Sequence, residues 1–150
     1  MPPAMTQFWN KLNANEKLVM YGVIAVLIAF LVGVVAGGYF GGTGSFGLVG
    51  AIAIGVIYWL KYSPNKINWP APVQTIVLVI AAIDAVFALL SLLALLGFFA
   101  LGLFTIAIIV NAIGCGLMVY GAWKEYQAMP KTTAVPPPAP PAAPPAPPAA

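Results

Sequence analysis

The chain has 150 residues, of which 62% are hydrophobic and only 6% are charged. Soluble domains contain about 25% charged residues, so this composition cannot supply a water-soluble surface and indicates a polytopic membrane protein. The formal net charge is +3, but no basic cluster with interleaved aromatics is present, which argues against nucleic acid as a partner.

Histidine is absent, and Cys115 is the only cysteine. An intramolecular disulfide is therefore impossible. The commonest metal ligand, the usual haem ligand and the usual general base are missing together. No Gly-rich phosphate loop followed by lysine occurs either. We therefore expect no metal, no cofactor and no enzymatic activity.

Residues 1–17 precede the first apolar stretch and are predicted to form a cytoplasmic N-terminal segment. Their sequence "TQFWNKLNANEKL" combines aromatic residues with asparagines that can cap the entering helix. Two interpretations remain open for this segment, a short helix in the membrane interface and a solvated lead-in.

Four apolar stretches follow, and each is long enough for a membrane span, which needs roughly 17–25 residues. They predict an all-α integral membrane protein, a four-transmembrane-helix bundle occupying residues 18–123. The predicted spans are 18–40, 44–60, 73–96 and 98–123. A glycine-marked turn near Gly97, extending toward Gly102, separates the last two spans.

The lysines predict the orientation of the four spans. With four crossings, all six fall on one side of the membrane, while the connectors "GGTGS" and "LLGFF" are uncharged. By the positive-inside rule, both termini and the middle loop are then cytoplasmic. Aromatic residues gather at the same face, among them Trp9, Trp59 and Trp123. We expect the plasma (inner) membrane of a prokaryote as the location.

Small residues recur at four-residue spacing in the first two spans, and such rows let helices approach closely in a bilayer. They predict helix packing, either between the first two spans, which we favour, or across a homo-oligomer interface. The predicted packing residues are Gly33, Gly37, Gly47, Ala51, Gly55 and, in the fourth span, Gly114.

The third span carries Asp84, about 16 Å from the start of the helix at 1.5 Å per residue and thus near the bilayer midplane. Folding the hairpin at Gly97 brings Asn111 to nearly the same depth on the fourth span. We therefore predict an intramembrane polar pair of Asp84 and Asn111, in which the amide donates to the carboxyl group. Ser91 and Thr105 extend this polar face.

Three roles remain open for Asp84. It can hold the hairpin together through Asn111, contact a polar group on another subunit, or serve as a proton or cation site. The first role is favoured, because the chain offers few other polar groups to line a water path.

Residues 124–150 form the predicted cytoplasmic tail, which from residue 134 onward contains only proline, alanine and one valine. Such a segment is predicted to be disordered and extended, as a spacer or, less favoured, as a ligand for a cytoplasmic protein.

Taken with the absent catalytic motifs, these features predict a non-enzymatic accessory or scaffold subunit of a membrane assembly. Its expected partners are membrane lipid, other membrane subunits or further copies of itself. The alternative is a small oligomeric transporter or channel that uses Asp84.

Overall fold

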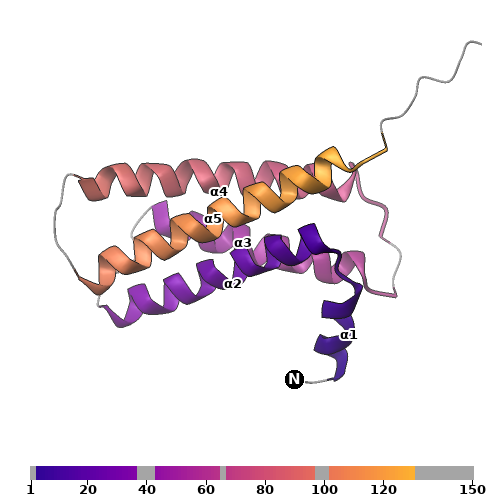
Figure 1. Cartoon of the computed structure of the whole chain (residues 1–150), viewed down its shortest axis with the longest axis horizontal. Coiled ribbons are helices and arrows are strands. Elements are labelled where there is room, and N and C mark those ends of the chain that lie inside the picture. The colour runs from indigo at the N-terminus through magenta and orange to yellow at the C-terminus, as the bar shows by residue number, and fades with distance from the viewer. Residues whose placement is uncertain (1–2, 37–42, 65–66, 97–101, 131–150) are drawn as a thin grey trace, which may run out of the picture.

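The computed structural model describes residues 3–36, 43–64, 67–96 and 102–130, and within these ranges every regular element is a helix. The elements are α1 (Pro3–Lys11), α2 (Ala14–Val35), α3 (Thr43–Lys61), α4 (Val73–Leu96) and α5 (Leu103–Gln127). Helices α2 to α5 run alongside one another as a bundle, and α1 lies across one end of it (Figure 1). Of the predicted tail, residues 124–127 belong to α5, and residues 131–150, which include the Pro/Ala-rich part predicted to be disordered, lie outside the described residues.

Local sequence explains where the long helices begin. Asn13 caps α2, since its side chain accepts from the Glu16 amide at 2.9 Å and the Glu16 carboxylate accepts from the Asn13 amide at 2.9 Å. Pro72 precedes α4, and its carbonyl accepts from the amides of Thr75 and Ile76. A proline at this position begins a helix without losing a hydrogen bond, because the first amides of a helix have no intrahelical acceptor.

Helices α3 and α4 follow their predicted spans closely, whereas α2 and α5 differ from theirs. Helix α2 begins at Ala14 rather than at residue 18, and it ends at Val35 rather than at residue 40. Helix α4 covers residues 73–96, and α3 extends one residue beyond each end of 44–60. Helix α5, however, begins at Leu103 rather than at residue 98, and ends at Gln127 rather than at 123. Gly102 is its N-cap in an extended conformation, so this glycine marks where α5 begins, while Gly97 lies outside the described residues.

Among the residues that the structure describes, three helices are long and apolar enough to cross a membrane, namely Ala14–Val35, Val73–Leu95 and Leu103–Gln127. Gly47–Lys61 of α3 is a shorter apolar helix. The chain is thus an all-helical protein with the character of a multi-pass integral membrane protein. The fourth crossing, through α3, stays a prediction.

The distribution of side-chain size agrees with a membrane setting. The interior consists largely of small and medium residues such as Val19, Ala51 and Ala81, each fully buried. Large apolar side chains lie outside instead, with Leu31, Leu93 and Ile113 more than half exposed. Soluble monomers seldom expose continuous apolar surface of this kind, whereas a lipid-facing surface has it throughout.

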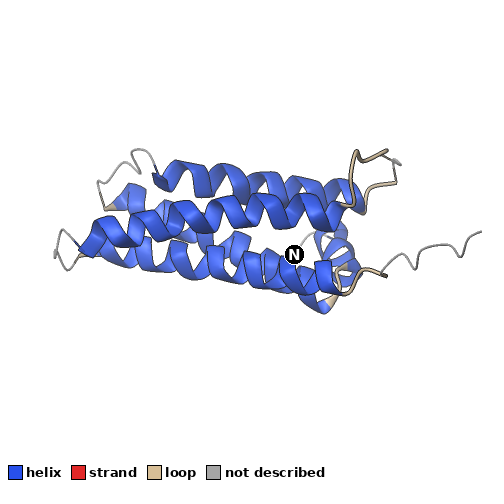
Figure 2. Ribbon diagram, turned by 90° about the horizontal axis from the view of Figure 1, so that it is seen from above, coloured by secondary structure: helices blue, strands red, loops and turns tan. Residues whose placement is uncertain are grey.

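The chain reverses direction after each long helix, so one end of the bundle carries the start of α2, the connection from α3 to α4 and the end of α5 (Figures 1 and 2). Lys17 and Lys124 belong to these segments, Lys61 ends α3 next to the connection, and Lys11 ends α1, which lies across the same end. The described lysines therefore gather at one end of the bundle, which we call the lysine end.

Candidate functional site

Asp84 lies in the interior of the bundle, where its side chain packs against α3. The residue is only 3% exposed. Its carboxyl group occupies the space beside the Cα of Gly50, and a Cβ at that position would overlap the carboxyl atoms. Oδ2 of Asp84 is buried without a hydrogen-bond partner. Burying an unpartnered polar oxygen is unfavourable, so this atom is the least satisfied polar group that the described interior contains.

Asn111 is also buried, at 5% exposure, and it packs over the next turn of the same helix. Its Oδ1 lies 3.4 Å from the position that a Cβ on Gly47 would take, and the Sγ atom of Cys115 lies 3.9 Å from the same position. Gly47 and Gly50 are three residues apart and therefore occupy successive turns of α3. The side chains of Asp84 and Asn111 thus each pack against a glycine of α3, Gly50 and Gly47 respectively.

The hydrogen bond predicted between Asp84 and Asn111 stays a prediction. Because Oδ2 has no partner, such a bond would have to use Oδ1. Sequence reasoning matched the depths of the two residues along the α4–α5 hairpin, and it did not foresee that α3 inserts its glycines beside them.

The residues predicted to extend the polar face and to pack the helices differ in their burial and contacts. The Ser91 hydroxyl donates to the carbonyl of Phe87 at 2.9 Å, one turn back in α4, and Ser91 and Thr105 are both half-buried. Gly33 and Gly47 are buried, and Ala51 is fully so. Gly55 is half-buried and approaches Val23 of α2. Gly37 lies outside the described residues.

The closest helix crossing involves Gly114, which was predicted to pack, and Gly22, which was not. A Cβ on Gly22 would lie 2.5 Å from the carbonyl oxygen of Gly114, and a Cβ on Gly114 would lie 2.9 Å from the carbonyl oxygen of Gly22. Gly121 repeats the arrangement, since a Cβ on Gly121 would lie 2.9 Å from the carbonyl oxygen of Asn15. These three glycines bring the backbones of α2 and α5 together, so that α2 packs most extensively against α5.

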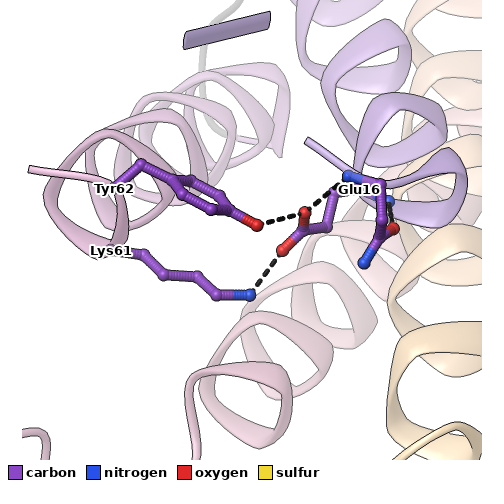
Figure 3. A network of polar contacts seen from close by, with 4 residues as sticks. Glu16, Lys61 and Tyr62 are labelled. Atoms are coloured by element: carbon purple, nitrogen blue, oxygen red, sulfur yellow. Dashed lines mark hydrogen bonds and ion pairs between the residues drawn. The ribbon is translucent and has the colours of Figure 1, made fainter. Parts of the chain in front are cut away.

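A second polar centre, not foreseen from the sequence, lies at the lysine end (Figure 3). The Glu16 side chain is fully buried. It forms an ion pair with the ammonium of Lys61 and accepts from the Tyr62 hydroxyl at 2.6 Å, in addition to the Asn13 amide. We call these four residues the Glu16 network. Three donors converge on one carboxyl group, which is the arrangement that stabilises its ionised form.

Aromatic rings and a second acid surround the Glu16 network. The Lys61 ammonium lies 5.3 Å from the ring centroid of Tyr62 and 5.9 Å from that of Tyr58, within the range of cation–π attraction. Burial, followed by the hydrogen bond to Glu16 and the charges of Glu16 and Glu125, raises the pKa of the Tyr62 phenol. Tyr62 therefore stays protonated at neutral pH and keeps its role as donor.

Glu125, on α5, is 7% exposed. The three acidic residues of the chain are thus all buried, two of them at the lysine end. The pattern N-x-x-E at Asn13–Glu16 is a sequence signal for the capping box. It carries no information about Lys61 and Tyr62, which approach from another helix.

The described residues contain no group of three or more histidine, cysteine, aspartate or glutamate side chains that could hold a metal ion. In comparisons with protein-family models, with curated proteins and with solved structures, the chain matched none.

Proposed function

We propose that the chain is a small non-enzymatic integral membrane protein that acts as an accessory or scaffold subunit of a membrane assembly. The observation that supports this most is the Glu16 network. It joins the start of α2 to the end of α3 through a part-buried ion pair with Lys61 and a hydrogen bond from the Tyr62 hydroxyl, both made by a fully buried Glu16 side chain. A scaffold has to hold a surface in a fixed shape for its partners, and cross-linking the ends of helices at the lysine end serves that purpose.

The proposed topology has four spans, with α3 as the fourth crossing and both termini cytoplasmic. The gathering of the described lysines at one end supports it through the positive-inside rule. In a Cys115→Ala background, a cysteine at position 43, before the apolar part of α3, should resist a membrane-impermeant thiol reagent added from the cytoplasmic side. Rapid labelling from that side would overturn the topology.

The scaffold role is tested by comparing assembly and flux. Chemical cross-linking in native membranes should yield a discrete complex larger than the purified chain, and the purified chain in vesicles should pass neither protons nor cations. We expect Asp84→Asn to change the amount of complex while leaving flux absent. The contrary result would be ion flux through the purified wild-type chain that is lost in Asp84→Asn while the complex stays intact. That result would overturn the scaffold role and favour a transporter.

The transporter alternative is favoured by one observation, the unpartnered Oδ2 of Asp84. An intramembrane acid is a functional hypothesis by default, and a carboxyl oxygen without a protein donor is free to bind a proton or a cation. Gly50 leaves the room in which that carboxyl group sits. The flux measurement above decides between the two roles.

A further inference from the structure

A groove of about 210 Å³ lies between α1 and the end of α3 at the lysine end. Its polar lining comes from both segments, with Gln7 and Lys11 on α1 and Ser63 just after α3. Its walls are aromatic, formed by Phe8, Trp59 and Tyr62. The groove therefore combines one cation and two neutral hydrogen-bonding groups with apolar walls.

Ring contacts hold the two sides of the groove together. The Phe8 ring lies 5.4 Å from that of Trp59 and 6.3 Å from that of Tyr62, measured between centroids. The Tyr62 hydroxyl is in turn anchored by its 2.6 Å bond to Glu16. Because Glu16 is fully buried in α2, the wall made by Tyr62 is fixed to the core of the bundle.

The charge balance makes the groove cationic. Of the lysines that the structure describes, Lys61 alone forms an ion pair, and its partner Glu16 is thereby neutralised. The other acidic residues, Asp84 and Glu125, are buried elsewhere. Lys11 is exposed and has no carboxylate to compensate it within the described part of the chain.

We propose that this groove binds the phosphate-bearing headgroup of an anionic phospholipid from the leaflet at the lysine end. The Lys11 ammonium attracts the phosphate as a point charge, while the Gln7 amide and the Ser63 hydroxyl can donate to its oxygens. Tryptophan and tyrosine rings sit at headgroup depth in membranes, which places the groove where such a headgroup lies. The inference rests on the membrane character of the chain and is independent of the scaffold role.

The test measures lipid binding to the full chain in mild detergent by native mass spectrometry, with phosphatidylglycerol as the anionic lipid and phosphatidylcholine as the neutral one. We expect one phosphatidylglycerol to bind more tightly than the rest and than phosphatidylcholine. Lys11→Gln should weaken that site about fivefold, as expected for one lysine near an anionic surface. Lys124→Gln, which removes a lysine of the same end outside the groove, should leave the site within about twofold.

Ser63→Ala provides a second variant, because Ser63 lies outside every helix and its loss does not perturb α1. We expect it to weaken the same site by two- to threefold, on the scale of one neutral hydrogen bond. Equal losses in Lys11→Gln and Lys124→Gln, or no loss in Ser63→Ala, would show diffuse charge attraction and overturn the proposal. Displacement of the lipid by millimolar inorganic phosphate would also overturn it, because the site would then bind free phosphate.

Discussion

Replacement of Glu16 by alanine removes three hydrogen bonds at once, from the ammonium of Lys61, the hydroxyl of Tyr62 and the amide of Asn13. Bonds to a charged group contribute about 1.5–3 kcal/mol each, so the sum over three bonds is at least about 4.5 kcal/mol. Two effects reduce this figure. Lys61 is 24% exposed and regains water, and alanine relieves the desolvation of a buried carboxylate. We expect the free energy of unfolding to fall by about 3 kcal/mol.

The chain provides its own probe for this measurement. Cys115 is the only cysteine and is fully buried, so a thiol-reactive fluorophore reports unfolding in detergent. Titration with a denaturing detergent then gives the free-energy difference between variants. Lys124→Ala is the matched control, because the Lys124 ammonium lies 5.7 Å from the ring centroid of Tyr120 and is not a member of the Glu16 network. It should change stability by less than about 1 kcal/mol.

A double-mutant cycle between Glu16 and Lys61 isolates the ion pair from the other bonds. We expect a coupling energy of about 1–3 kcal/mol, as for residues that share a network. A coupling near zero, together with equal stability of Glu16→Ala and Lys124→Ala, would refute the reasoning that the buried network fixes the lysine end.

The helix crossings yield further predictions. Gly22→Ala should destabilise the chain by about 1–3 kcal/mol or more, because its Cβ would meet a backbone carbonyl of α5 that cannot rotate away. Gly116→Ala is the control, because a Cβ at that position would meet nothing within 4 Å. If the two variants had the same free energy of unfolding, measured with the thiol-reactive fluorophore, that result would contradict the close crossing. Gly50→Ala should be destabilising in the wild-type background and less so in Asp84→Ala, because the carboxyl group that blocks the new methyl is then gone. Additive effects on unfolding free energy would show that the two residues do not meet.

Much of the fold follows from lengths that the bilayer imposes. A span has to be apolar over about 20 residues, and so α4 occupies the residues that its apolar stretch indicates. The start of α5 was less well predicted, because the residues before it are as apolar as a span and only Gly102 marks where the helix begins. Composition alone does not mark the first residue of an apolar helix.

The contacts between helices were harder to predict than the helices. A small residue signals that something approaches closely, but it does not say which helix does so. Gly22 and Gly50 lie outside the rows of small residues at four-residue spacing from which packing was predicted. Nevertheless, among the described glycines a Cβ at these two positions would approach its neighbours most closely. Glu16 was missed for a related reason. A glutamate in the first turn of a helix usually faces water, and its burial depends on Lys61 and Tyr62, which lie at the far end of the next helix, 45 and 46 residues along the chain.

The pairing of α2 with α5 has a consequence for how the protein is made. Helices enter the membrane in chain order, so α2 is inserted first and its principal neighbour last. Until α5 arrives, the glycine face of α2 lacks the backbone against which it fits, and α3 and α4 cannot replace it with their own surfaces. The nascent protein therefore passes through a stage in which α2 can already contact α3 through the Glu16 network, while its glycine face is still without α5. Chains that stop before α5 should be the ones that membrane proteases remove.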